Sequence, residues 1–278
     1  MRYAINIPNF GAIGDARTLA ELAHEAEESG WDGFFLWDHI GADWGESRFA
    51  EPWVALSAIA MSTSRMTLGP LVTPLPRRRP WVVAREAVTL DHLSNGRLIL
   101  GVGIGSDFGQ EFSAYGENPD DKLHGAMLDE ELEIITRLWS EKPLDFDGAY
   151  YHIHGARHLP GPRQQPRIPI WVAARWPNKK PCQRAARWDG VYPLAQEGEL
   201  TPAELRQMLA YTLPLRSHPN APFDILTVGH LDGKDPEADA ATIAEWADAG
   251  ATWWQEGFLP NQSIATVRAR IHAGPPRV

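Results

Sequence analysis

An acidic residue and a histidine follow an apolar segment near the start of the chain. Residues 33–37 read as a buried strand, and Asp38 and His39 come directly after it. A histidine titrates near neutral pH, so His39 has the chemistry of a general acid or base, and the carboxylate of Asp38 could orient it. Asp38 could equally cap a helix and His39 could be a hydrogen-bonded loop residue. The two residues alone leave both interpretations open.

Glycines follow a second buried segment. Residues 98–100 form a short apolar strand, and Gly101, Gly103 and Gly105 come after it. Glycines at the end of such a strand let the backbone approach a bound group. Their spacing is not G-x-G-x-x-G and no helix follows promptly, which disfavours a dinucleotide-binding loop.

A basic connection precedes a predicted helix in the middle of the chain. Residues 173–180 include Ala174, Arg175, Trp176 and Lys179. Free N–H groups at a helix start attract phosphate, Arg175 and Lys179 add positive charge, and Trp176 could cover a planar ring. The alternative interpretation is a basic surface loop.

Two further motifs favour less specific interpretations. The arginines at 77–79 are expected to be a solvated charged face, with attraction of an anionic cofactor tail as the alternative. The histidines at 152, 154 and 158 lack an acidic or cysteine partner at ligand spacing, so we expect no metal site.

Strands and helices alternate along the whole chain. The predicted strands are 3–7, 33–37, 66–73, 98–100, 168–173, 190–192, 224–229 and 252–255. The predicted helices are 15–29, 51–63, 81–93, 121–141, 180–187, 202–216, 236–249 and 263–273. This pattern predicts a (β/α)8 TIM barrel, a fold that carries its functional groups at the carboxyl ends of the strands. Residues 145–167, with an Asp147-Gly148 turn, are expected to be an insertion before strand five, near the barrel mouth.

Composition limits the possible partners and compartment. The 278 residues predict a single barrel domain over 1–278. A net charge of −10 argues against nucleic-acid binding, and no apolar run has the length of a membrane span. The single cysteine cannot form an internal disulfide, and we expect a cytoplasmic protein with a small-molecule substrate.

Several ordered motifs resemble the luciferase-like monooxygenase superfamily, whose members use FMN or the deazaflavin F420. The matching motifs are Leu68-Gly69-x-x-Val72-Thr73-Pro74, Arg79-Pro80-x-x-x-Ala84-Arg85-Glu86, Thr89-Leu90-Asp91-x-Leu93-Ser94-x-Gly96-Arg97, Leu100-Gly101-Val102-Gly103 and Trp37-Asp38-His39. Weaker agreement covers nearly the whole chain.

The resemblance implies roles for individual residues. His39 would take the substrate's proton beside the hydride-carrying carbon, and Asp38 would orient it or contact the cofactor. Glu111 would lie near the active-site mouth, the alternative being a solvated loop carboxylate. A non-proline cis peptide bond between Leu71 and Val72 would support the cofactor ring.

The resemblance also implies contacts beyond the ring's support. Thr73 lies on the same strand as the cis bond, and the three glycines would let the ring or its ribityl chain approach. Pro70 would make this strand irregular in any case, because it removes an N–H. Helices 51–63 and 81–94 would form a homodimer interface.

The sequence therefore predicts an F420- or FMN-dependent oxidoreductase that transfers a hydride to or from a small organic substrate. The Asp38-His39 pair favours F420, with FMN as the close alternative. The sequence is also compatible with an FMNH₂-dependent monooxygenase and with a barrel that binds a flavin without turnover.

Overall fold

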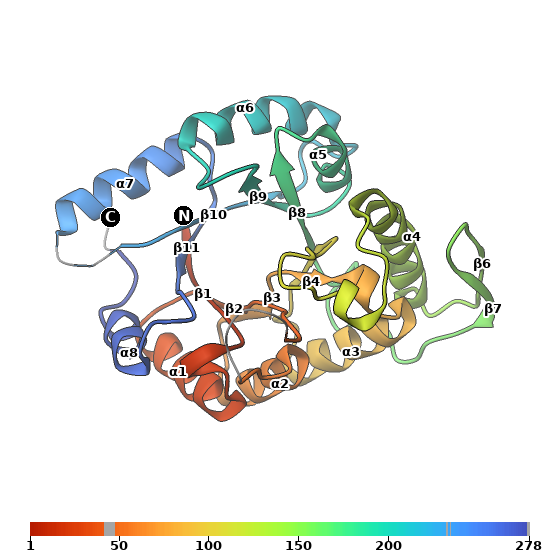
Figure 1. The fold of residues 1–278 in the computed structure, drawn as a ribbon, viewed down its shortest axis with the longest axis horizontal. Helices are drawn as coiled ribbons and strands as arrows, with labels where there is room; N and C mark the ends of the chain where they lie inside the picture. The colour runs from red at the N-terminus through yellow and green to blue at the C-terminus, as the bar shows by residue number, and fades with distance from the viewer. Residues whose placement is uncertain (42–47, 232, 234, 277–278) are drawn as a thin grey trace.

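Parallel strands form a ring that helices surround (Figure 1). The computed structural model describes residues 1–41, 48–231, 233 and 235–276. The strands of the ring are β1 (Arg2–Ile7), β2 (Gly33–Leu36), β3 (Thr67–Pro70), β4 (Thr73–Pro74), β5 (Leu100–Gly103), β8 (Ile170–Trp176), β9 (Gly190–Ala195), β10 (Asp224–Gly229) and β11 (Trp253–Gly257). The helices are α1 (Ala16–Glu28), α2 (Pro52–Ser62), α3 (Pro80–Leu93), α4 (Asp121–Trp139), α5 (Lys179–Ala185), α6 (Pro202–Thr212), α7 (Pro236–Asp248) and α8 (Ile264–His272).

The order of strands closes the ring into the predicted (β/α)8 barrel. The sheet runs β3-β2-β1-β11-β10-β9-β8-β5-β4. β3 and β4 are two parts of one barrel strand, because only Leu71 and Val72 separate them. β4 pairs with β5, and Leu68 of β3 forms a bridge with Leu98 just before β5. The barrel prediction is confirmed.

Two layers of apolar side chains hold the barrel. One layer lies between strands and helices and includes Leu68, Leu100 and Val172. The other fills the amino-terminal half of the ring's interior, where Phe35, Trp171 and Trp253 contact one another with ring centroids 5.2–6.0 Å apart. Successive strand residues face opposite sides. On each strand, the residue two positions after a member of this inner layer therefore also faces the barrel interior, nearer the carboxyl end of the strand.

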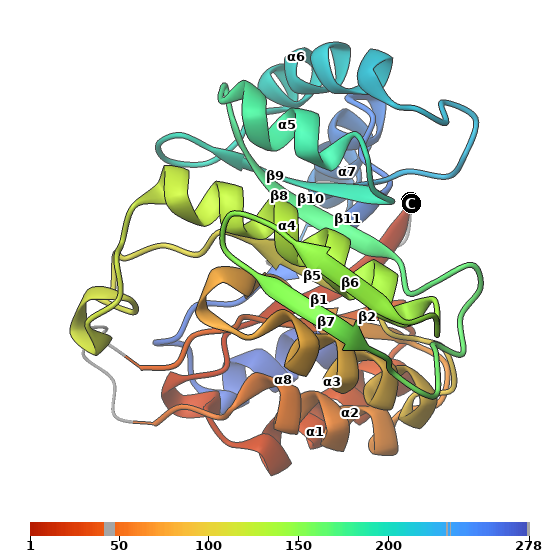
Figure 2. The ribbon, with the colours of Figure 1, turned by 90° about the vertical axis from the view of Figure 1, so that its right-hand side faces the viewer.

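A hairpin accounts for most of the insertion. β6 (Leu144–Asp147) and β7 (His152–Ala156) are antiparallel, and the predicted turn at Asp147-Gly148 joins them. The Glu130 carboxylate of α4 accepts N–H groups from residues 149–151 in this turn. Figure 2 shows the hairpin outside the barrel, against α3 and α4.

The segment after the hairpin does not lie near the barrel mouth, where we expected the insertion. The segment after the hairpin contacts the far end of α3: Gly161 binds His92, and Arg163 and Gln164 bind Asp91. A connection from a helix to the next strand returns to the amino ends of the strands. The insertion therefore supports the outer wall and the base of the barrel.

Candidate active site

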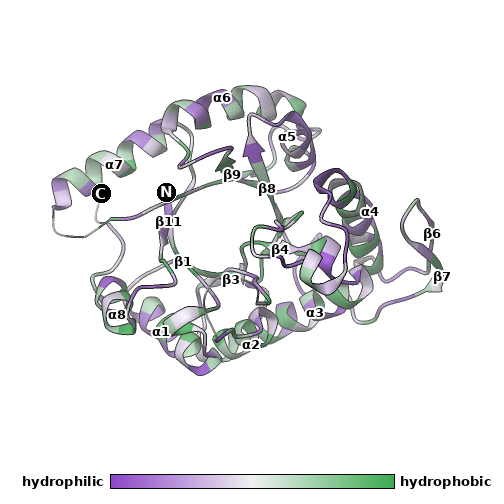
Figure 3. Ribbon diagram, viewed as in Figure 1, coloured by the Kyte–Doolittle hydropathy of each residue, from purple (hydrophilic) through white to green (hydrophobic). Residues whose placement is uncertain are grey.

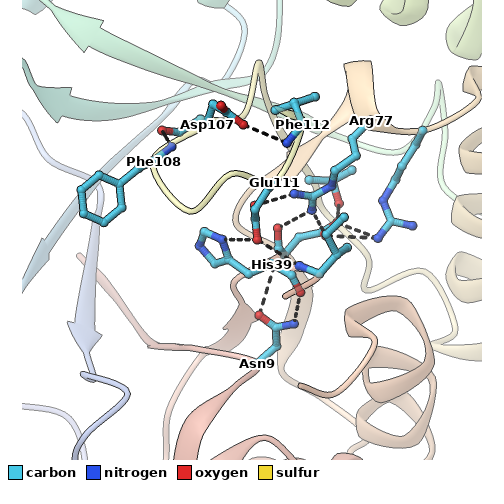
Figure 4. Close-up of polar contacts among 12 residues, drawn as sticks. Asn9, His39, Arg77, Asp107, Phe108, Glu111 and Phe112 are labelled. Carbon is cyan, nitrogen blue, oxygen red and sulfur yellow. Dashed lines mark hydrogen bonds and ion pairs between the residues drawn. The ribbon is translucent and has the colours of Figure 1, made fainter. Parts of the chain in front are cut away.

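The predicted acidic and histidine residues come together at the carboxyl ends of two strands, and an arginine that follows a third strand joins them. Asp38 and His39 follow β2, and Glu111 lies in the connection after β5. Figure 4 shows His39, Glu111 and Arg77 close together. Arg77 ends the 3-10 helix η2 (Leu75–Arg77) that follows β4. This is the face where barrel enzymes carry their chemistry.

His39 and Glu111 form a direct pair. The His39 Nδ1 atom lies 3.0 Å from Oε1 of Glu111, and the Ile40 N–H donates to the same oxygen at 3.1 Å. Arg77 donates to Oε2 at 2.5 Å. Burial raises the pKa of the Glu111 carboxyl, but the His39 hydrogen bond, the charges of His39 and Arg77 and the Ile40 N–H outweigh burial and lower it. The alternative of a solvated loop carboxylate is wrong, because the Glu111 side chain is only 3% exposed.

Asp38 is an anchor for other side chains rather than a group open to a ligand. Its Oδ2 accepts the Thr73 hydroxyl at 2.8 Å, and its Oδ1 accepts Arg77 at 2.8 Å and Arg78 at 3.1 Å. Its side chain is fully buried. Of the two roles predicted for Asp38, this arrangement fits the orienting one.

The arginine run is not the solvated face that we expected. The side chains of Arg77 and Arg78 are 6% and 16% exposed, and both bind Asp38; Arg78 also binds Glu51. Only Arg79 is exposed. The partners of Arg77 lie 34 and 39 positions away in sequence, which a local reading of charge cannot detect.

Asn9 is a site residue that the sequence analysis missed. Its amide oxygen accepts the backbone N–H of His39 at 3.2 Å, and its Nδ2 donates to the His39 carbonyl at 2.7 Å (Figure 4). The rings of Phe10 and Trp37 lie 5.5 and 5.9 Å from the imidazole, centroid to centroid. Backbone and ring of His39 are thus both held in place. A buried Asn just after the first strand was the only available signal.

A polar layer lies in the barrel interior, above the tryptophan layer. Asn6 donates to Gln255 at 2.7 Å and accepts the Trp37 indole N–H at 2.5 Å. Asn6, Trp37 and Gln255 each lie two positions after a residue of the inner apolar layer (Ala4, Phe35 and Trp253), so they face the same side of the sheet. Burial raises the pKa of Tyr192 to about 12, which its hydrogen bond with Asn6 only partly offsets. Nε2 of Gln255 is buried and has no partner within the described residues.

The cis peptide bond between Leu71 and Val72 is present where we predicted it. The glycines beside it have a packing role. A Cβ on Gly101 would lie 2.3 Å from the Pro70 carbonyl oxygen, and one on Gly103 would lie 2.8 Å from Val72. Gly105 has φ +79° and is confined by Phe112 and Pro74. Cofactor contact by these glycines stays a prediction.

The basic connection differs from its predicted form. Ala174, Arg175 and Trp176 belong to β8, which extends to Trp176, and only Pro177 and Asn178 separate it from α5. Ala174 packs in the outer core, Arg175 is exposed, and Lys179 Nζ lies 3.8 Å from the Trp176 ring centroid. Figure 3 shows the change from hydrophobic to hydrophilic along β8. A phosphate site here stays a prediction.

Neither a metal centre nor a membrane span is found in the described part of the chain. No group of three or more His, Cys, Asp or Glu side chains there could hold a metal ion. No helix there is long and apolar enough to cross a membrane.

The chain thus has the architecture of a barrel enzyme: a parallel (β/α)8 barrel with a histidine–carboxylate pair at the carboxyl ends of its strands. Within that class, residues 1–258 match the model of the luciferase-like monooxygenase family, and the chain belongs to this family.

Three similar proteins illustrate the range of relatives. An F420-dependent glucose-6-phosphate dehydrogenase from Gordonia bronchialis is 36% identical over 169 residues, which is 59% of this chain and 48% of that protein. The chain thus spans about half the length of the curated relatives that it matches. The F420-dependent tetrahydromethanopterin reductase of Methanopyrus kandleri has a TM-score of 0.77 at 16% identity, and a monooxygenase from Streptomyces bottropensis has 0.78 at 20%. Each structural match covers 98% of both chains. At these identities the two structures support the fold alone.

Proposed function

We propose that this protein is a cytoplasmic oxidoreductase that transfers a hydride between F420 and a small organic substrate. The observation that carries the proposal is the His39–Glu111 pair at the carboxyl face, with the imidazole still partly exposed. An F420-dependent dehydrogenase among the relatives supports this choice of cofactor over FMN.

The residues at the mouth suit a planar cofactor with carbonyl groups. Gln255 offers a buried N–H donor without a partner in the described structure, and an atom of this kind needs an acceptor. Val72 is half-buried beside the cis bond, on the strand that we propose backs the ring. Arg175 and Lys179 supply exposed positive charge for the cofactor's phosphate. These features fit the group, and they suggest a place for it across the barrel mouth, between β4, β8 and β11.

The proposed chemistry divides between cofactor and protein. F420, when bound, supplies the carbon that accepts or returns the hydride. His39 takes the proton from a substrate hydroxyl as the hydride leaves, and returns it in the reverse direction. Glu111 holds the imidazole through Nδ1 and stabilises its charge when Nε2 is also protonated. Arg77 and Asn9 keep the pair in place, because both bind it from fixed, buried positions.

Titration with the two candidate cofactors tests the proposal. We expect F420 to bind more tightly than FMN, measured by fluorescence, and to lose its fluorescence on reduction when alcohols or glucose 6-phosphate are supplied. Tighter binding of FMN, or binding of neither, would contradict the F420 assignment. Binding of F420 with no turnover of any substrate would favour the alternative of a non-catalytic barrel.

We also propose that a second copy of the chain covers the outer face of α2 and α3. Val54 and Met61 of α2 are 65% and 70% exposed, and Val82 of α3 is 45% exposed. Exposed apolar side chains grouped in this way are typical of an interface. Light scattering should give a dimer, and Met61→Glu should shift it toward monomer. A monomeric parent protein would contradict the proposal.

A further inference from the structure

Arg77 also lines a cavity between the start of α3 and the start of α4. This cavity has a volume of about 300 Å³. Its walls include the arginines at 77–79, His124 and Met127 of α4, and Tyr151 from the hairpin turn. Its volume is at the lower end of the range for small-molecule sites, about 300–1,000 Å³.

Two of the arginines carry unused donors. The Nε atoms of Arg77 and Arg78 are buried and have no hydrogen-bond partner within the described residues. The Arg77 side chain is 6% exposed, and its two Nη atoms are occupied by Glu111 and Asp38. A buried N–H without an acceptor is costly, so an acceptor bound in the cavity would stabilise it.

The positive charge available in the cavity comes from Arg79, because Arg77 and Arg78 already pair with carboxylates. Arg79 is exposed and forms no ion pair among the described residues, so its charge is available. Arg79 is also the N-cap of α3, so the helix starts at the cavity, and the positive amino-terminal end of a helix favours negative charge. The opposing carboxylate in the lining is Glu117.

The acidic residue behind Tyr151 does not cancel this positive charge. Tyr151 donates to Glu131 of α4 at 2.5 Å, and Glu131 is fully buried. Burial raises the pKa of Glu131 to about 8, although the Tyr151 hydrogen bond opposes the rise. Burial therefore favours the neutral form of this carboxyl group. His124 is occupied by the Asn118 carbonyl, which it contacts at 2.7 Å.

We propose that this cavity binds a small oxyanion, a phosphate or a carboxylate group, through the Nε–H groups of Arg77 and Arg78 and the guanidinium of Arg79. The lining of the cavity does not include Val72, Arg175 or Lys179, so this inference does not rest on the cofactor contacts proposed above. Because Arg77 also binds Glu111 and Asp38, one side chain connects the bound anion to the residues around His39.

Calorimetric titration of the cofactor-free protein tests this inference. Inorganic phosphate and glutarate serve as the two probes at constant ionic strength, and they distinguish a phosphate from a carboxylate ligand. We expect saturable millimolar binding of at least one. Arg79→Gln should weaken it about tenfold, the effect of losing one charged hydrogen bond. Lys122→Gln is the matched control, because Lys122 is an exposed cation of α4 outside the cavity lining.

Nitrogen–proton NMR spectra give a second readout, which locates the anion. The Nε–H resonances of Arg77 and Arg78 should shift as the anion saturates the site, and both variants should keep the parent melting temperature. The inference is overturned if neither anion binds in the millimolar range. It is also overturned if Arg79→Gln and Lys122→Gln weaken binding equally, or if both Nε–H resonances stay in place while an anion binds.

Discussion

Two parts of the barrel's carboxyl-terminal rim differ in how their charged side chains are arranged: one holds buried ion pairs and the other holds exposed cations. At β2, β4 and β5, the charged groups are matched: His39 with Glu111, and Arg77 with both Glu111 and Asp38. At β8 and α5, Arg175 and Lys179 are exposed, and Lys179 lies over the rings of Trp176 and Tyr211. The first region is fixed by its own ion pairs, which suits the proposed proton transfer. The second is open, which suits the proposed binding of an anionic cofactor.

The largest effect should come from His39. His39→Ala should lower kcat by about 10²–10⁴-fold, because it removes the group that exchanges the proton. F420 affinity should change much less, since the proposed phosphate contacts lie on another strand. Steady-state kinetics and fluorescence titration check the two quantities. An unchanged kcat would remove His39 from the mechanism, and a loss of affinity alone would make it a ring-positioning residue.

Arg77 should matter most for stability. Arg77→Met leaves the buried carboxylates of Asp38 and Glu111 short of a partner, which should cost about 3–5 kcal/mol of unfolding free energy. Arg175→Met, at the open part of the rim, should cost less than about 0.5 kcal/mol. Urea denaturation measures both. Equal costs would show that the two regions do not differ as described.

Acid should weaken the matched region selectively. The folded-state pKa of Glu111 is lowered from 4.5, so its stabilisation is complete above pH 4.5 and is lost as the pH falls through the lowered value. Glu111→Gln should cost about 1–3 kcal/mol at pH 7. Below pH 4.5, the unfolding free energy of the Glu111→Gln variant should fall less steeply with decreasing pH than that of the parent protein, as urea denaturation at several pH values would show. Glu117→Gln, which changes an exposed carboxylate, should keep the parent profile.

The open region should affect binding without affecting stability. Lys179→Glu should weaken F420 binding about tenfold, or 1.4 kcal/mol, and leave the melting temperature nearly unchanged. Lys142→Glu makes the same charge change at an exposed position near the base of the barrel and should leave affinity unchanged. Parent-like affinity in Lys179→Glu would move the phosphate away from α5.

Most of the fold is predictable from the sequence because the signals for it are local. Asp15 is a typical residue for the start of a helix, and it does cap α1 by accepting the Thr18 N–H. The strand predicted at 224–229 has the bounds of β10. The cis bond at Leu71 follows from the family resemblance, since no local pattern specifies it. The predicted strand ended at residue 173, whereas β8 continues to Trp176. The prediction stopped early because Arg175 resembles a loop residue, but the end of a strand can expose every second side chain.

The candidate site was predictable only in part. Asp38, His39 and Glu111 can be identified singly, but their contacts depend on which strand ends become neighbours in the closed ring. The role of Arg77 was missed for that reason: a run of three arginines resembles a solvated face until two carboxylates from distant loops meet it. The insertion was misplaced because its position depends on the direction of its connection to β8, which its composition does not reveal.

Chemical rescue tests the central claim, proton exchange by His39, most directly. His39→Ala would be assayed with bound F420 and a turned-over substrate while free imidazole is added over a range of pH. We predict that imidazole restores much of the lost kcat, and that the rescue follows the concentration of the neutral imidazole base during substrate oxidation. A folded, F420-bound variant that imidazole does not rescue, or that needs no rescue, would contradict the account.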